Sequence, residues 1–174
     1  MENPRFTIAL IYDFDGTLAP GNMQEYDFIP AVGKSNKEFW SEANELAEQQ
    51  DADGVLTYMA RMIQSARSKG LSLRREAFRE SGRKVQLYKG VKEWFERINR
   101  YGEEQGIRIL HYINSSGLTE IIEGTEIAHE FRKIYACSFL YDVDGIAYWP
   151  AVAVNYTNKT QFIFKINKGV ESVY

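Results

Sequence analysis

The sequence predicts an α/β fold with a mostly parallel sheet, a helical insertion after the first strand, and a small β-hairpin. Three observations predict it: an apolar run at residues 6–12, helical spacing between residues 21 and 89, and β-like runs at 107–114, 134–141 and 146–154. Strands that alternate with helices along a chain are typical of α/β domains, in which helices pack against a sheet.

The first run, FTIALIY at residues 6–12, is predicted to form a strand that is buried on both faces. Its residues are almost all apolar or β-favouring, with no alternation of polar residues, and it lies between Pro4 and Asp13. Runs of this kind belong to parallel sheets that are covered by helices. We therefore expect this strand to lie inside the sheet.

The segment that follows changes to the spacing of helices. Ser35 and Glu38 have the spacing of a capping box, and apolar residues then recur at helical intervals to residue 47. A second helical pattern covers residues 55–66. The segment 21–89 is therefore predicted to be helical.

The remainder of the chain returns to alternating elements. Apolar residues mark one face of a helix at 91–101, and residues 118–126 have the composition of another helix. The sequence DVDG at 142–145 is a strong turn signal between two β-like runs, which predicts a hairpin. Thr157 is the expected cap of a last helix at about 159–169.

Length, charge and cysteine content exclude several classes of protein. The chain has 174 residues, 44% hydrophobic and 26% charged, which fits one globular domain with a modest insertion. A net charge of -3 argues against binding to nucleic acid or to an anionic membrane. Cys137 is the single cysteine, so no intrachain disulfide can form, and it is expected to be buried. The N-terminal apolar run is too short for a signal or a membrane span, so we expect a cytoplasmic protein.

The candidate chemistry is concentrated in the run DFDGT at residues 13–17. Asp13 and Asp15 are two residues apart, so in an extended backbone both project to one side, about 6 to 7 Å apart. Asp13 could attack phosphorus as an ionised carboxylate, while Asp15 could hold a proton for the leaving oxygen. Gly16 lets backbone amides approach phosphoryl oxygens, and Thr17 can fix the turn or reach the nucleophile.

Two further polar groups are expected at the same edge of the sheet. Ser115 follows the second strand and would offer a hydroxyl to a phosphoryl oxygen, and Lys159 would supply a positive charge. Ser116 could take the role of Ser115, and Lys165 or Lys168 that of Lys159. Mg²⁺ is the expected cofactor, because it accepts one or two carboxylates together with waters and a substrate oxygen.

These motifs resemble those of the haloacid-dehalogenase-like (HAD) hydrolase superfamily. Residues 11–18, IYDFDGTL, look like its first motif, 113–117, INSSG, like its second, and Lys159 like its third. The insertion at 21–89 lies where the phosphoserine-phosphatase-like branch has its helical cap. The resemblance therefore implies a HAD-like Rossmannoid core at 1–20 and 90–174 with a cap between these parts.

The resemblance also implies an activity and a role for each matched residue. The expected reaction is hydrolysis of a small phosphate monoester through an aspartyl-phosphate on Asp13, with Asp15 as acid and then base. Ser115 and Lys159 would bind the phosphate, together with Gly16, Thr17 and Ser116. Mg²⁺ would be held by Asp13 and by the backbone carbonyl of Asp15.

The fourth motif of the family, an acidic pair after a further strand, is not found before residue 174. The pairs Asp142/Asp144 and Asp51/Asp53 are interpreted as a hairpin turn and an interhelical loop. We therefore expect a truncated chain of weak or no activity. Its first strand would then be an apolar edge open to self-association.

Two other functions remain open at this point. A catalytically silent HAD-like scaffold would lack turnover, and a phospho-acceptor signalling domain would keep a long-lived phosphoryl adduct. The long helical insertion argues against a compact receiver domain.

Overall fold

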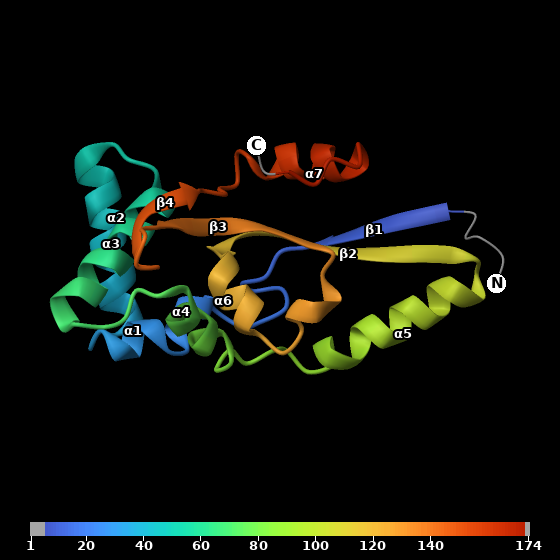
Figure 1. Cartoon of the computed structure of the whole chain (residues 1–174), viewed down its shortest axis with the longest axis horizontal. Helices are drawn as coiled ribbons and strands as arrows, with labels where there is room; N and C mark the ends of the chain where they lie inside the picture. The colour runs from blue at the N-terminus through green and yellow to red at the C-terminus, as the bar shows by residue number, and fades with distance from the viewer. Residues whose placement is uncertain (1–5, 173–174) are drawn as a thin grey trace.

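The computed structural model describes residues 6–172 and shows strands and helices packed together around one sheet (Figure 1). In chain order the elements are β1 Phe6–Tyr12, the 3₁₀ turn η1 Met23–Glu25, α1 Phe28–Ala31, α2 Asn36–Gln50, α3 Gly54–Lys69, α4 Arg75–Gly82, α5 Val91–Glu104, β2 Ile107–Leu118, α6 Thr119–Gly124, the 3₁₀ turn η2 Ala128–Glu130, β3 Lys133–Tyr141, β4 Ala147–Val152 and α7 Lys159–Asn167.

The four strands form one sheet in the order β1-β2-β3-β4. β1, β2 and β3 run parallel, and β4 runs antiparallel to β3. The register of β1 and β2 ends with Tyr12 opposite Ile113, so the residues after them emerge at the same edge of the sheet. The α/β class, the parallel sheet and the hairpin are confirmed.

The helices are divided between the faces and one end of this sheet. Figure 1 shows α5 below β2 and α7 above the sheet, while α1 to α4 gather at the end where β4 also lies. Side chains from both regions share one buried core, which includes Phe14, Phe39 and Phe95. Within residues 6–172, no helix combines the length and the apolar content that crossing a bilayer requires.

The prediction that β1 is buried on both faces is wrong. β1 pairs only with β2 among the described residues, and Phe6 and Ile8 are 69% and 44% exposed. Only the last three residues of the strand are half-buried. An apolar run records a tendency to form a strand, but burial depends on the neighbours that the sheet supplies. The expectation of an apolar edge describes this strand better, and self-association through it stays a prediction.

Most of the helices lie where short sequence patterns predict them. Ser35 caps α2 in a reciprocal capping box with Glu38, as its spacing predicts. The prediction that Thr157 caps the last helix is wrong. The Asn155 side chain accepts hydrogen bonds from the amides of Thr157 and Asn158 at 3.0 and 3.1 Å, and Asn158 is the capping position of α7. Asparagine competes effectively for nearby backbone amides in this way.

Both acidic pairs interpreted as turns lie in turns. Asp142 begins the β3–β4 hairpin, where its carboxylate accepts from the amides of Asp144 and Ile146. Asp51 and Asp53 lie between α2 and α3, and Asp53 caps α3 by accepting from two of its first amides. Cys137 is fully buried in β3, as expected.

Candidate active site

The predicted site residues meet at a cavity of about 340 Å³ beside the carboxyl ends of β1 and β2. Because parallel strands end at one edge, the residues that follow Tyr12 and Ile113 are brought together there. Four of the predicted residues, Asp13, Asp15, Ser115 and Ser116, belong to its lining.

Asp13 is held in one orientation by both of its carboxylate oxygens. Lys159 donates from Nζ to Asp13 Oδ2 at 2.7 Å, and the Phe14 amide donates to Oδ1 at 2.8 Å. The Asp13 side chain is 44% exposed, against 24% for Lys159, so the carboxylate stays open to an incoming ligand. This ion pair joins residues that are 146 positions apart in the chain.

Lys159 reaches Asp13 because several hydrogen bonds fix the start of α7. Asn114, at the end of the regular part of β2, donates from Nδ2 to the Lys159 carbonyl at 2.9 Å. Asn155 orders the preceding loop and also donates to Asp53 Oδ2 at 2.7 Å. The lysine is therefore positioned both by the sheet and by the turn that opens α3.

Asp15 lies deeper and carries the properties of a proton donor. Its Oδ1 accepts from the Met23 amide at 2.9 Å, which ties the loop after β1 to η1. Burial raises the pKa of the Asp15 carboxyl to about 7; the carboxylates of Asp13 and Glu25 add to this, while the Met23 amide and Lys159 oppose it. A carboxyl group that is half-protonated near neutral pH can give up a proton and take it back.

Ser115 and Ser116 are placed at the cavity by an irregularity in β2. The pairing of β2 with β3 shifts register between Asn114 and Leu118, so residues 115–117 bulge from the regular ladder. Ser115 Oγ accepts from the Gly117 amide at 3.0 Å, and the Ser116 carbonyl accepts from the Tyr58 hydroxyl at 2.7 Å. Both serines line the cavity, so the two alternatives for this role remain open.

Gly117 is required by close packing against the same loop. A Cβ atom at this position would lie 2.0 Å from Met23 Cε and 3.0 Å from Asp15 Oδ2. The nearest atoms belong to the end of the Met23 side chain, so a side chain at position 117 would require this methionine to shift. Glycine at this position therefore lets β2 lie close to η1 with Met23 in place.

The other predicted residues lie farther from the cavity. Gly16 and Thr17 form the turn after Asp15, where the Thr17 amide donates to the Phe14 carbonyl at 3.2 Å, and neither belongs to the cavity lining. Lys165 donates to the Ser172 carbonyl, and the Lys168 ammonium lies 5.5 Å from the Phe164 ring centroid. Of the three candidate lysines, Lys159 is the one bonded to Asp13.

Sequence reasoning missed the residues that the helical insertion adds to the cavity. These come from η1 and its flank, from α2 and from α3, and they are Asn22, Gln24, Trp40, Val55 and Tyr58. Their spacing carries no motif, because their convergence depends on how the insertion packs against the loop that follows β1. The helical register of Trp40 and Tyr58 could have suggested only that they share faces with buried neighbours.

The donor set of the cavity is compatible with Mg²⁺. Asp13 would supply a carboxylate and Asp15 its backbone carbonyl, and this ion accepts one or two carboxylates with waters and substrate oxygens. Within residues 6–172, no third His, Cys, Asp or Glu joins them in a metal-binding group. Most of the coordination shell would thus come from water and ligand.

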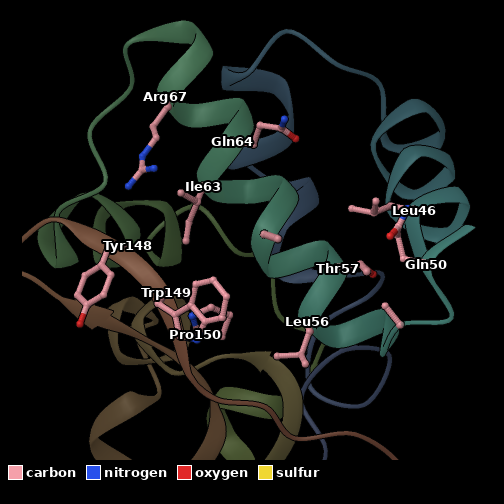
Figure 2. A pocket seen from close by; sticks show the side chains of 12 residues that line it. Leu46, Gln50, Leu56, Thr57, Ile63, Gln64, Arg67, Tyr148, Trp149 and Pro150 are labelled. Atoms are coloured by element: carbon pink, nitrogen blue, oxygen red, sulfur yellow. The ribbon is translucent and has the colours of Figure 1, made fainter.

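A second, larger cavity of about 610 Å³ lies between α2, α3 and β4 (Figure 2). Figure 2 shows Tyr148 and Trp149 on the β4 side and Leu46 on the α2 side, with α3 between them. Arg67 is the one charged residue in its described lining. This cavity has no cluster of groups that could carry out acid, base or nucleophilic chemistry.

Comparison with known proteins identifies the fold. A hydrolase of the HAD family from Salmonella enterica serovar Typhi superposes with a TM-score of 0.63 at 14% identity, over 95% of this chain and 52% of that one. A phosphoserine phosphohydrolase-like protein from Francisella tularensis gives 0.57 at 19% identity, over 93% and 73%. A substrate-bound phosphoserine phosphatase gives 0.59 at 9% identity, over 98% and 74%. The chain has a HAD-like fold of the phosphoserine-phosphatase type.

One sequence relative accompanies these structures. A protein of Borreliella burgdorferi, described only as uncharacterized, is 33% identical in an alignment that is 188 residues long and covers 93% of this chain. The chain spans 65% of the length of that relative and 52% of the Salmonella HAD-fold hydrolase. No protein-family model matches the chain.

Proposed function

We propose that this HAD-like chain is a phosphomonoester hydrolase that works through an aspartyl-phosphate on Asp13. The observation that carries the proposal is the pairing of two unlike carboxyl groups in one cavity. Asp13 is exposed and bonded to Lys159, whereas Asp15 is half-buried with a pKa raised to about 7. One group is suited to attack, and the other to proton transfer.

In the first half-reaction, an oxygen of the Asp13 carboxylate forms a bond to phosphorus on the side opposite the leaving group. The bond from phosphorus to the ester oxygen breaks, its electron pair stays on that oxygen, and Asp15 supplies the proton that makes it an alcohol. Lys159 and the Ser115 hydroxyl stabilise the phosphoryl oxygens, on which negative charge gathers.

In the second half-reaction, water attacks the phosphorus of the aspartyl-phosphate. Asp15 accepts the proton that this water loses, the bond from phosphorus to Asp13 breaks, and inorganic phosphate leaves. Mg²⁺ bound by the Asp13 carboxylate and the Asp15 backbone carbonyl would supply positive charge to the transferring phosphoryl group.

The experiment is a turnover assay with para-nitrophenyl phosphate in the presence and absence of Mg²⁺. We expect Mg²⁺-dependent release of phosphate, reduced about a thousandfold or more by Asp13→Asn, since the variant lacks the nucleophile. The control is Asp144→Asn, which makes the same chemical change in the exposed hairpin turn.

Other outcomes would support the alternative functions. Phosphate analogues that bind without any turnover would indicate a silent scaffold. A phosphoryl adduct on Asp13 that persists for hours would indicate a phospho-acceptor domain. Turnover that survives Asp13→Asn would contradict the proposal.

A further inference from the structure

The apolar cavity between α2, α3 and β4 has one face of α3 as its floor (Figure 2). Leu56, Ala60, Ile63 and Arg67 line it at intervals of three or four residues, so they follow one another along the same face of the helix. From the first to the last of them, the row is about 16 Å long at the rise of an α-helix. Figure 2 shows side chains of α2 and of β4 on opposite sides of this row. The cavity therefore has the form of a trough along α3.

The walls of this trough expose apolar side chains to water. Trp149 is 65% exposed, and Tyr148 and Leu56 are 44% and 43% exposed. Binding sites for small molecules are concave and mostly apolar, with volumes of about 300 to 1,000 Å³. At about 610 Å³, the apolar cavity has the size and the composition of such a site.

The extent of the cavity favours a small molecule over a second protein chain. Its described lining consists of 12 residues, whereas a stable protein interface uses about 20 to 30 residues on each side. β4 is the outer strand of the described sheet, and Pro150 within it has no amide hydrogen to donate to an added strand. A protein partner would therefore find little surface and an unsuitable strand edge.

The charges around the cavity favour a ligand with one anionic end. Arg67 is the one charged residue in the described lining, and among residues 6–172 no carboxylate pairs with it. At the other end of the row, Asp51 and Asp53 flank the lining residue Ala52. An anionic group is thus attracted to the Arg67 end of the trough and repelled from the opposite end.

We infer that the apolar cavity binds a monocarboxylic acid with a long alkyl chain, which lies along α3 with its carboxylate at Arg67. The alkyl chain covers the exposed surfaces of Leu56 and Trp149, and the release of water from them drives binding. This site is separate from the cavity beside Asp13, so the inference does not depend on the proposed function.

The test is a calorimetric titration of the wild-type chain with decanoate, 1-decanol and hexanoate. Decanoate and 1-decanol have the same number of carbon atoms, and hexanoate keeps the carboxylate on a shorter chain. We expect decanoate to bind about fivefold more tightly than 1-decanol, which cannot pair with Arg67, and about tenfold or more above hexanoate, which buries fewer methylene groups. A lack of saturable binding, or affinities that are equal for decanoate and either of the other two compounds, would overturn the inference.

Variants of Arg67 assign the carboxylate to its place. Arg67→Met should weaken the binding of decanoate about fivefold and leave that of 1-decanol within about twofold, and Arg67→Lys should restore most of the loss. The matched control is Arg100→Met on the exposed side of α5, which should leave both affinities within about twofold. An unaltered affinity for decanoate in Arg67→Met would overturn the placement of the carboxylate.

A variant that fills the floor of the trough tests the path of the alkyl chain. Ala60 is exposed, so Ala60→Trp places an indole ring in the cavity without overlap in the core, and we expect it to abolish binding of decanoate. Gln49→Trp adds the same ring on α2 outside the described lining and should keep the wild-type affinity. Binding of decanoate to Ala60→Trp as tight as to the wild type would overturn the inference.

Sedimentation velocity tests for a different occupant, a second copy of this chain. We expect the wild type and Ala60→Trp to have the same sedimentation coefficient at every protein concentration, because the trough is too small for a protein interface. Self-association of the wild type that Ala60→Trp abolishes would show that a second copy covers the cavity, and would overturn the inference.

Discussion

Two cavities of this protein, the one beside Asp13 and the apolar one, differ in size and in chemical content, and the smaller of the two carries the candidate chemistry. The cavity beside Asp13 measures about 340 Å³, and the apolar one between α2, α3 and β4 about 610 Å³. In the first, groups from distant parts of the chain converge, with Lys159 bonded to Asp13 and Asp15 bonded to Met23. In the second, side chains such as Trp149 offer contact area alone.

In this comparison, the convergence of polar groups and not the larger volume marks the candidate site. Two carboxyl groups with unlike surroundings line the small cavity at the ends of β1 and β2, and the Lys159 ammonium is bonded to one of them. Many hydrogen bonds hold these groups in place, so few other residue types could replace them. The residues that line the apolar cavity are not restricted to particular types in this way.

The largest effect is expected for Asp15→Asn with an alkyl phosphate as substrate. An alkoxide leaving group needs a proton, so we expect kcat/KM to fall about 10²- to 10⁴-fold. para-Nitrophenolate leaves without a proton, and its ester should lose much less. The wild-type kcat/KM for the alkyl ester should fall as pH rises above about 7, because Asp15 then loses its proton. Equal losses of kcat/KM for both esters would contradict the assignment of Asp15 as the proton donor. A variant whose kcat/KM still falls as the pH rises would contradict it as well.

Lys159→Met should reduce kcat/KM about a hundredfold, because the phosphoryl oxygens lose one positive charge. Lys168→Met serves as the control, since this lysine lies against Phe164 and should leave the rate within about twofold. The measurement is steady-state kinetics at saturating Mg²⁺. Equal losses of kcat/KM in the two variants would mean that the substitutions disturb the structure of α7, and that the charge of Lys159 has no specific role.

Gly117→Ala should lower the free energy of unfolding by about 1–3 kcal/mol, because the new methyl group would overlap Met23. Urea denaturation followed by circular dichroism measures this difference. Gly54→Ala is the control: its added Cβ meets no atom within 4 Å, and alanine favours the helix that begins there. A variant at position 117 as stable as the wild type would show that η1 can move away from β2.

The smallest effect is expected in the apolar cavity. Trp149 is 65% exposed and lies on β4, away from the Asp13 cavity. Trp149→Ser should therefore leave kcat/KM for para-nitrophenyl phosphate within about twofold and the free energy of unfolding within about 0.5 kcal/mol. A loss of turnover of tenfold or more would mean that the two regions of the molecule are coupled.

The parts that could be predicted from the sequence are those fixed by strand topology. Asp13, Ser115 and Lys159 were expected at one edge because parallel strands end together, and the structure brings all three there. The capping box at Ser35 and the turn at residues 142–145 are local signals, and both were located correctly.

The parts that could not be predicted depend on long-range packing or on competition between neighbours. Gln24 and Trp40 line the cavity only because the insertion packs against the loop that follows β1. Thr157 has a suitable side chain for a cap, but its hydroxyl donates to Asn155 Oδ1 at 2.6 Å, and Asn158 takes the capping position. The burial of β1 was overestimated because its composition does not report how many strands adjoin it.

The hydrogen bond between Asp53 and Asn155 gives the molecule a mechanical link between its two halves. Asp53 opens α3 in the helical insertion, and Asn155 shapes the loop that aims the Lys159 ammonium. The position of the Lys159 ammonium thus depends on where the insertion places the first turn of α3 as well as on the sheet.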